Sequence, residues 1–496
     1  MAPCAAGLLA AGLLGLLAAS MAAAVQELPG LTTIRPVLVD PDATGYGTFQ
    51  SHNQKVVSNR RGIFMTHIRT RNEPYTAQQW RLSRSTDGGQ SFTTIYEATH
   101  ATNPPVLETD QDDNIYLMRV DFVDGNAYLY RFLADNDYRD PIVTTVPGGA
   151  AGKYSMACDR ERRRLCYFAH NETFHIVSLD GTVLSRTHLI RSGRDACLQY
   201  PLLSLDPDGT LHAAWTSQKH GVYLYWDIHY MRSPDGGHRW ETLHGAPLEL
   251  PVVADQGGPS DRITRDDEFE AHTWLSSFMA KDGKVHFVYL AQTDPPREHY
   301  ARCDLKTGAR DVDIWPEFSG ERISLRGLDG FFATRASLPG APLYCVASAQ
   351  GRIGCLASDD NGQTWYDYAL SEDAYTTYSI GGCRELTADG FVIGSFTDRL
   401  ASPQDTGGQS HVYFFKVQAG LSQARVIEAV EEGGRTQVRF ADAHGQPTQV
   451  RFRAADGPWS TWRPFAAAVE IRIEGGRPTR YQLKSSVGVE SPPCEM

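Results

Sequence analysis

Short runs of alternating hydrophobic and polar residues, separated by Gly, Asp and Pro turns, recur between about residue 50 and residue 418. Alternation with a period of two is typical of half-buried β-strands, and no long segment has the 3.6-residue period of an amphipathic helix. The runs form seven strand–turn–strand units, which begin near His52, Asn103, Tyr154, Tyr200, His272, Phe331 and Cys383. Their spacing of roughly 50 residues is typical of the four-stranded blade of a β-propeller.

Three of these units share the pattern Ser-x-Asp-x-Gly-x-x-aromatic, each time after a strand-like run. The copies are residues 85–92 (STDGGQSF), 233–240 (SPDGGHRW) and 358–365 (SDDNGQTW). In such a turn the Asp carboxylate can accept backbone N–H bonds, the Gly adopts a positive φ, and the aromatic ring packs beneath the strands. The pattern resembles the Asp-box turns (BNR repeats) of sialidase-like β-propellers.

The sequence therefore predicts an all-β protein in which residues 31–418 form a β-propeller with three Asp-box turns. Seven units indicate a seven-bladed propeller; six blades stay open because residues 241–267 make a long loop. Residues 31–40 are expected to supply a strand that closes the ring.

After Val417 the units stop, and five short alternating segments follow. They predict a small C-terminal β-sandwich module over residues 421–496. Trp459 and Trp462 of this module are expected in its core, with a sugar-stacking surface as the alternative.

Residues 1–24 form a Leu/Ala-rich stretch that ends in Ala22-Ala23-Ala24. The apolar run is shorter than a membrane span, and the small residues suit signal-peptidase cleavage. We therefore expect a signal peptide and a secreted or periplasmic protein. An uncleaved N-terminal anchor is the alternative.

The charge balance is acidic, with 47 Lys+Arg against 59 Asp+Glu and a formal net charge of −12. No Lys/Arg block stands out, which argues against nucleic acid as a partner. Aromatic residues make up 10% of the chain and charged residues 21%, a balance that argues against extended disorder. No membrane partner is expected once the leader is removed.

Nine cysteines are present, and removal of the leader with Cys4 leaves an even eight. Cys158 and Cys166 flank one short turn, and Cys345 and Cys355 flank another. Each pair could form a disulfide across a β-hairpin, which would suit an oxidising compartment.

The acidic turns 110–113 and 206–209 are the candidates for structural Ca²⁺, although ordinary turn chemistry explains them equally well. No CxxC pair occurs, so zinc has little support. No cofactor and no catalytic metal are expected.

The first unit carries two histidines, His52 ahead of its first strand and His67 near the end of its second. A hairpin could bring them together near the mouth of the central channel. A His pair there can donate and accept protons near neutral pH. Two ordinary polar residues at strand ends are the alternative interpretation.

The His-Asn pair that opens this hairpin, the Gly in its turn, and the second His before an Asp box resemble BNR-repeat propellers that include ulvan lyases and related rhamnose–glucuronate lyases. The fourth unit, from Tyr200-Pro201 to its Asp box, follows the same cadence, so the resemblance spans roughly residues 50–240. The resemblance implies that His52, His67 and Arg119 are catalytic. Candidate substrate-binding residues are Asn53, Arg69, Asn103, Tyr154 and Tyr200.

In a lyase of this kind, Arg119 would neutralise a uronate carboxylate while the two histidines act as base and acid. One departure from the family pattern affects proton transfer. The family has a Tyr-Pro pair where this chain has Asn103-Pro104, and that Tyr transfers the proton. A His must take this role, or Tyr154 or Tyr200 must reach in, or the activity is not that of a lyase.

The predicted function is cleavage of an acidic polysaccharide or oligosaccharide that contains uronate or rhamnose, by β-elimination or by His-assisted hydrolysis. One alternative is a sialidase-like exo-glycosidase, because the segments around Arg35-Pro36 and Arg384-Glu385 weakly resemble sialidase motifs. The other alternative is a non-catalytic glycan-binding propeller.

Overall fold

The computed structural model describes residues 31–50, 53–69, 78–120, 124–255, 257–325, 329–400, 410–455, 457–473 and 476–496. Within these ranges the chain is almost entirely β-structure, and its helices are two 3-10 turns, η1 (Ala134–Asn136) and η2 (Asp266–Glu268). The predicted all-β class is confirmed. The predicted signal peptide and His52 lie outside the described residues. Neither described helix has the length and apolar character needed to cross a membrane.

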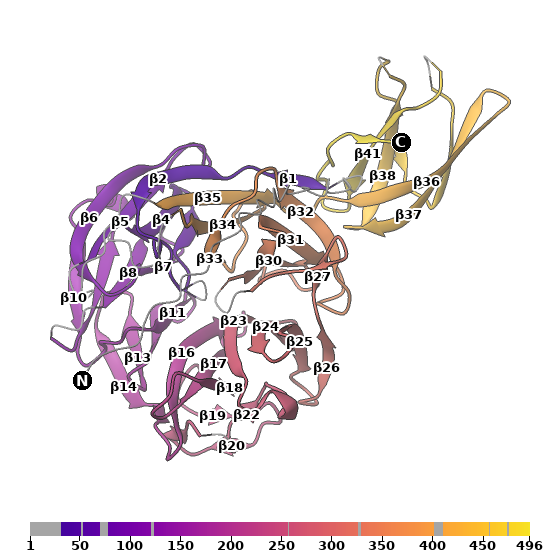
Figure 1. The fold of residues 1–496 in the computed structure, drawn as a ribbon. Coiled ribbons are helices and arrows are strands. Elements are labelled where there is room, and N and C mark those ends of the chain that lie inside the picture. Colours follow the sequence, from indigo (N-terminus) through magenta and orange to yellow (C-terminus); the bar gives the residue numbers. More distant parts are fainter. Residues whose placement is uncertain are drawn as a thin grey trace, which may run out of the picture.

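Antiparallel sheets of mainly four strands follow one another along the chain, and Figure 1 shows them set around a common centre. The first three sheets are β3 (Val56–Asn59), β4 (Gly62–Ile68), β5 (Gln78–Ser85) and β6 (Thr93–Ala101); β7 (Val106–Thr109), β8 (Ile115–Val120), β9 (Ala127–Phe132) and β10 (Ile142–Val146); β11 (Tyr154–Asp159), β12 (Arg164–Ala169), β13 (Thr173–Ser178) and β14 (Val183–His188). The fourth is β16 (Ala196–Leu205), β17 (Leu211–Lys219), β18 (Tyr225–Ser233) and β19 (Trp240–Glu241), extended by β20 (Pro247–Leu248) and β22 (Asp261–Arg262).

The ring continues with β23 (His272–Lys281), β24 (Lys284–Gln292), β25 (Arg297–Asp304) and β26 (Arg310–Ile314). Next come β29 (Phe331–Thr334), β30 (Leu343–Ala349), β31 (Arg352–Ser358) and β32 (Tyr366–Ser371), to which β1 (Thr32–Ile34) adds in parallel. The last sheet is β33 (Thr377–Gly382), β34 (Phe391–Asp398), β35 (Ser410–Gln418) and β2 (Val37–Ala43). Two small ribbons are β15 (Ile190–Arg191) with β21 (Val252–Val253) and β27 (Glu317–Phe318) with β28 (Glu321–Arg322).

Contacts between successive first strands close this arrangement into a ring. β3 contacts β7, β7 contacts β11, and the series continues through β16, β23, β29 and β33, while β34 returns to β3. The N-terminal strand β2 completes the last sheet by pairing with β35, as the sequence predicts. Hydrophobic side chains pack between neighbouring sheets; Phe64 and Trp80, for example, share one core with Leu117. The ring is therefore held by its cores and by a pairing between the two ends of the propeller-like region.

The Asp-box turns connect the third and fourth strands of their sheets. The Asp87 carboxylate accepts the backbone N–H of Ser91 at 3.0 Å. Gly89 has a φ of +87°, and a Cβ at this position would lie 2.4 Å from the Phe414 ring, so only glycine fits. The equivalent carboxylates Asp235 and Asp360 accept the N–H of Arg239 and of Thr364. The three aspartates therefore stabilise the turns, and Gly89 allows close packing against the neighbouring sheet.

Both predicted disulfides are wrong, because the eight described cysteines are free. In the hairpin β11–β12, Cys158 lies opposite Leu165, and Cys166 lies opposite Ala157. Cross-strand partners share a face and neighbouring residues alternate, so the two sulfurs lie on opposite faces of the sheet. The same offset of one residue separates Cys345 from Cys355, which lie opposite Leu356 and Val346. Disulfides therefore give no support to an oxidising compartment.

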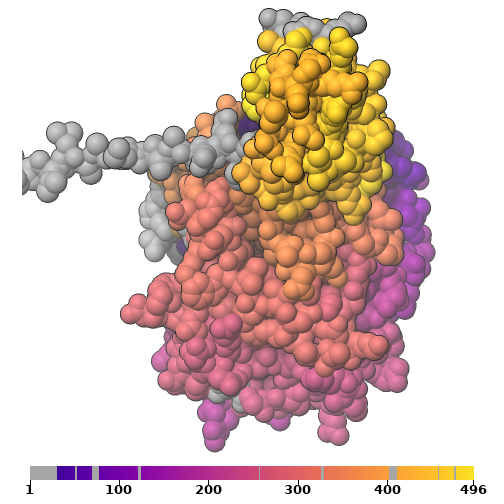
Figure 2. All heavy atoms as spheres, turned by 90° about the vertical axis from the view of Figure 1, so that its right-hand side faces the viewer, coloured from indigo at the N-terminus to yellow at the C-terminus, as the bar shows by residue number. Residues whose placement is uncertain are grey.

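After the ring, the chain forms two further sheets, seen at the upper right of Figure 1 and in yellow in Figure 2. They are β36 (Gln423–Glu432), β37 (Arg435–His444) and β40 (Ala468–Ile471), and β38 (Pro447–Arg453), β39 (Arg463–Pro464), β41 (Arg480–Ser485) and β42 (Cys494–Glu495). One hydrophobic core joins them, with Val438 from the first sheet and Phe452 from the second. Trp459 and Trp462 are only half-buried and lie outside this core, so their predicted core position is wrong.

Candidate functional site

The ring has two ends, defined by the direction of the first strand of each sheet. We call the end where these strands begin the start face, and the end where they finish the end face. Asn53, Asn103 and Lys153 precede first strands and lie at the start face. Asp110 and Arg160 follow first strands and lie at the end face.

A β-bulge in the first strand of the fourth sheet places Tyr200 at the start face. The register between β16 and β17 shifts between Gln199 and Leu202, and Tyr200 has a φ of +44°. Bulges re-aim side chains, and a non-glycine residue in this conformation stores strain that often marks a functional site. The Tyr200 ring lies 4.2 Å from the Lys153 ammonium.

Lys153 is largely buried at the start face and has only neutral partners. Its Nζ donates to Gln199 Oε1 and, at 3.5 Å, to the hydroxyl of Tyr225. None of the ion pairs among the described residues includes Lys153. Burial lowers its pKa from the usual 10.5 to about 8, so the side chain is still mostly charged at pH 7. Among the described residues this ammonium has no counter-ion, and an anionic ligand would supply one.

His170 fixes the orientation of the amide that holds Lys153. Gln199 Nε2 donates to His170 Nε2 at 2.9 Å, so Gln199 Oε1 faces the ammonium. Burial, together with the Lys153 charge, lowers the pKa of His170 to about 4. The ring is therefore neutral at pH 7 and can accept this hydrogen bond. The three side chains form a preorganised chain behind the Tyr200 ring.

Aromatic rings extend from this point along the start face. Tyr225 begins β18, and His272 and Trp274 begin β23. The Tyr225 ring stacks on His272 at 4.8 Å and meets the edge of Trp274 at 4.5 Å. Tyr223 lies 5.1 Å from Tyr225 and is 69% exposed. An exposed ring in such an array offers a stacking surface for a sugar, while Lys153 offers a positive charge.

Of the residues predicted from the sequence, Asn53, Asn103 and Tyr200 lie at this region. Asn103 donates to the carbonyl of Gly152, the residue before Lys153. Gln50 donates to the same carbonyl at 3.1 Å and accepts from Asn53 at 3.2 Å. The loops before the first three sheets are therefore tied together beside Lys153.

The other predicted residues at the start face engage different partners. His67 is buried and its Nε2 lies 2.9 Å from Asp40, which also binds Arg81 at 3.1 Å. Arg69 pairs with Asp42 at 3.1 Å. Both contacts are made to β2, on the outer edge of the neighbouring sheet.

Arg119 and Tyr154 are likewise engaged within the ring. The Arg119 guanidinium lies 4.3 Å from the centre of the Tyr128 ring and donates to the carbonyl of His100. Tyr154 is fully buried, and its hydroxyl donates to the carbonyl of Met118 at 3.4 Å. The structure shows no contact among His67, Arg119 and Lys153, whereas His52 lies outside the described residues.

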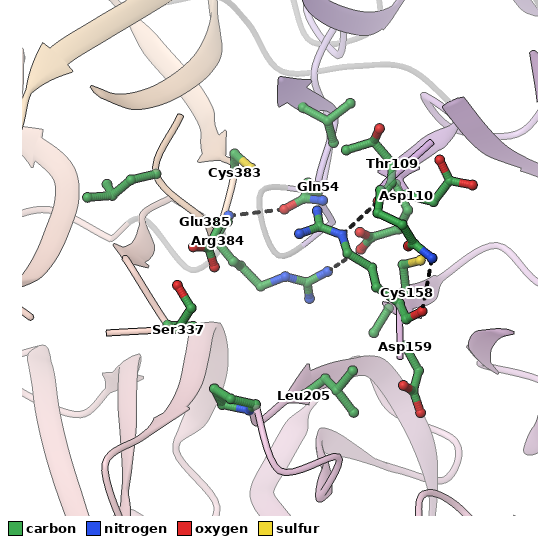
Figure 3. A pocket seen from close by; sticks show the side chains of 18 of the residues that line it. Gln54, Thr109, Asp110, Cys158, Asp159, Leu205, Ser337, Cys383, Arg384 and Glu385 are labelled. Carbon is green, nitrogen blue, oxygen red and sulfur yellow. Dashed lines mark hydrogen bonds and ion pairs between the residues drawn. The ribbon is translucent and has the colours of Figure 1, made fainter. Parts of the chain in front are cut away.

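A cavity of about 560 Å³ opens at the end face (Figure 3). Arg384 reaches across it toward the side that carries Asp110 and Cys158. Its guanidinium donates to Glu108 at 2.7 Å, to the carbonyl of Leu203 at 2.6 Å and to the carbonyl of Met156 at 2.9 Å. Arg384 therefore links the last sheet to three others across the centre of the ring.

The residues behind the sialidase alternative do not share a site. Arg384 is engaged at the end face, as described. The Arg35 side chain is 74% exposed and pairs with Glu372 at 3.1 Å.

The acidic turns are explained by their own hydrogen bonds. The Asp110 carboxylate accepts the backbone N–H groups of Asp112 at 3.0 Å and Asn114 at 2.9 Å. Asp206 binds His212 at 3.1 Å. Within the part of the chain that the structure describes, no group of three or more His, Cys, Asp or Glu is arranged to hold a metal.

The fold and the repeated turns are similar to those of BNR-repeat propellers. A family model described as "BNR repeat-containing family member" matches residues 156–309. No curated protein matches the chain. The predicted resemblance to BNR-repeat propellers is confirmed over this part of the ring.

Solved ulvan lyases have a similar fold. A PL25 ulvan lyase bound to -[GlcA(1-4)Rha3S]- gives a TM-score of 0.57 at 10% identity and covers 77% of this chain and 96% of its own. A second PL25 ulvan lyase structure gives 0.54 at 11% identity, with the same coverage. The polysaccharide lyase Uly1 gives 0.51 at 8% identity and covers 78% of this chain and 100% of its own. At these identities the similarity establishes the fold alone.

The sequence interpretation missed Lys153, His170, Gln199, Tyr223, Tyr225, His272 and Trp274. Lys153 directly precedes Tyr154, which begins a predicted unit, so the sequence predicts its position at the start of a strand. The sequence does not predict the burial of Lys153, because the rings that cover it come from Tyr200 and Tyr225, far along the chain.

Proposed function

We propose that the protein cleaves an acidic polysaccharide or oligosaccharide that contains uronate or rhamnose, and that the substrate lies at the start face beside Lys153. The proposal rests on the largely buried ammonium of Lys153, whose partners in the described part of the chain are all neutral. A uronate carboxylate would supply the missing counter-charge, and the exposed Tyr223 ring would stack on a neighbouring sugar.

The cleavage step is either β-elimination or His-assisted hydrolysis. In β-elimination, the ammonium of Lys153 offsets the negative charge that develops on the uronate carboxylate when the neighbouring C–H proton leaves. Burial raises the pKa of Tyr200, so its hydroxyl stays protonated and suits the acid that protonates the departing sugar oxygen. His52 is the candidate base. The fold similarity to ulvan lyases is consistent with this chemistry.

Replacing Lys153 by Met tests the proposal. On a uronate polysaccharide, wild-type protein should produce the ultraviolet absorbance of an unsaturated uronate, and Lys153→Met should lose about 100-fold in kcat/KM or more. New reducing ends without that absorbance would indicate hydrolysis. Lys416→Met is the matched control, because Lys416 binds the Asp-box carbonyl of Gly88 at 2.6 Å, away from the start face. Equal activity of Lys153→Met and wild type on every uronate substrate would contradict the proposal.

The pH profile provides a second test. Because the pKa of Lys153 is about 8, the ammonium loses its proton above that pH. We expect kcat/KM to fall about tenfold per pH unit above pH 8. In Lys153→Arg the charge persists, so the fall should move to higher pH. A profile that rises through pH 8 would mean that Lys153 acts as a base instead.

We also propose that each sheet of the ring is one blade and that the propeller has seven blades. The closed series of contacts between first strands supports this count. An experimental density map that shows six blades would contradict it.

A further inference from the structure

The C-terminal module carries a row of cations on the outer face of its β38–β41 sheet. Arg451 lies opposite Gln482, and Arg453 lies opposite Arg480. Cross-strand partners share a face, and residues two apart on a strand do too. The register therefore places four cations on one face, namely Arg451, Arg453, Arg480 and Lys484. The alternating residues Val450 and Phe452 point into the module's core.

Two indole rings are inserted between these cations. The Arg453 guanidinium lies 5.0 Å from the centre of the Trp459 ring, and Arg451 lies 5.1 Å from the same ring. Arg451 also lies 4.4 Å from the Trp462 ring, which Lys484 meets at 5.6 Å. The order is therefore Arg453, Trp459, Arg451, Trp462, Lys484, which we call the cation–indole row. Both indoles are half-buried outside the core.

This row suits an anion better than a neutral sugar. Cations already cover the indole faces, so those faces are not open for stacking on a sugar ring. A guanidinium stacked on an indole keeps its N–H edge for a carboxylate or sulfate. Among the described residues of the module, two carboxylates pair with these four cations: Glu490 lies 3.1 Å from Arg451 and 3.8 Å from Lys484, and Glu495 binds Arg480. The face keeps a positive excess.

The charge of the module differs from that of the rest of the chain. Residues 421–496 contain 10 Lys+Arg and 9 Asp+Glu, so the remaining residues carry a net charge of −13. An acidic polymer is repelled by such a ring except at local cationic sites. A separate cationic face on the module would hold the polymer near the ring.

We propose that the cation–indole row is a second, non-catalytic binding site for anionic polysaccharide, and that it recognises the carboxylate or sulfate groups of the polymer. The site does not depend on cleavage at the start face. It would raise the local concentration of polymer around the ring by adding a second point of attachment.

Affinity electrophoresis of the full-length protein tests this site. Gels containing polygalacturonate or dextran sulfate should retard the wild type, and gels containing neutral dextran should not. Arg451→Gln/Lys484→Gln should weaken binding about tenfold or more. Arg435→Gln/Arg439→Gln is the matched control, because these arginines lie on β37 in the other sheet and pair with Glu470 and Glu428. The control should bind within about twofold of the wild type.

Further variants separate this site from the proposed cleavage site. Lys153→Met removes the proposed attachment at the start face, so it should weaken the retardation without abolishing it, and Arg451→Gln/Lys484→Gln should weaken it further in the same background. Lys484→Gln alone is the milder variant at the end of the row and should weaken binding about threefold. Equal retardation of wild type and both row variants would overturn the proposal, as would the absence of any retardation of the wild type. Complete loss of retardation in Lys153→Met, or binding to phosphatidylserine vesicles but to neither polymer, would also overturn it.

Discussion

Replacing Arg384 by Met should lower the free energy of unfolding by about 3–5 kcal/mol, the usual cost of removing one partner from a buried ion pair. The substitution leaves Glu108 buried without its cation at 2.7 Å and leaves the carbonyls of Leu203 and Met156 without their donor. Burial already raises the pKa of Glu108, so its charge is costly without Arg384. Urea-induced unfolding of the full-length protein at pH 7 measures the effect.

Arg335→Met is the control for Arg384, because Arg335 lines the same cavity but makes one long bond of 3.4 Å to the carbonyl of Thr387. It should change the free energy of unfolding by less than about 1 kcal/mol. Adding Glu108→Gln to Arg384→Met should recover part of the loss, since it removes the unpaired charge. If Arg384→Met were as stable as Arg335→Met, Arg384 would not hold the ring together.

Acid should destabilise the protein from about pH 6.5 downward, above the usual pKa range of carboxyl groups. Burial lowers the pKa of His170, His175 and His229 to about 4 and that of His286 to about 3. Between pH 6.5 and those values the unfolded chain binds protons that the folded protein does not. Stability is therefore complete above pH 6.5 and lost as the pH falls, by about 1 kcal/mol per histidine per pH unit.

Several groups oppose this loss, because burial also raises the pKa values of the carboxyl groups Glu108, Asp261, Asp367 and Glu385. Burial raises the pKa of Asp227 to about 6, so the folded protein takes up a proton there, and the pKa of His299 is raised. Burial also lowers the pKa of His272. The net slope between pH 7 and pH 6 should still favour unfolding as the pH falls, because five histidines of the unfolded chain take up protons around pH 6.5. Unfolding by urea at pH 7, 6 and 5 measures the slope.

His286→Gln should reduce the number of protons taken up on unfolding by close to one, and the slope of stability against pH should fall accordingly. Gln can still bond to the Tyr300 hydroxyl, which lies 2.9 Å from His286 Nδ1. His188→Gln is the matched control for the substitution, because the His188 side chain is 55% exposed. A free energy of unfolding that stays constant from pH 7 to pH 5 would show that these histidines are not buried as neutral rings.

The strands of the ring were predictable because their cause is local. Alternation marks a half-buried strand wherever it occurs, and the Asp-box octapeptide contains its own carboxylate, glycine and aromatic ring. The two disulfide predictions were wrong because they depended on the register between neighbouring strands, which the alternation pattern does not show. A shift of one residue between β11 and β12 moves Cys166 to the other face, and the pattern of either strand alone does not determine the register.

The candidate site was less predictable because its cause is not local. His67 meets Asp40 only because the N-terminal strand β2 crosses to the last sheet, next to the first. Lys153 gains its character from Gln199, Tyr200 and Tyr225, which converge on it only in the folded ring. The sequence therefore indicated Asn53, Asn103 and Tyr200 as candidates. The Lys153 ammonium beside them became apparent only in the folded structure.

If a carboxylate of the substrate lies against Lys153, binding of the substrate must change the pKa of that lysine. The Lys153 Cε chemical shift, assigned by comparison with Lys153→Arg, can be followed against pH with and without a saturating oligouronate. We expect a pKa of about 8 in the free protein and a rise when the oligouronate binds, because a paired ammonium holds its proton more tightly. An oligouronate that binds without changing the pKa of Lys153 would contradict it.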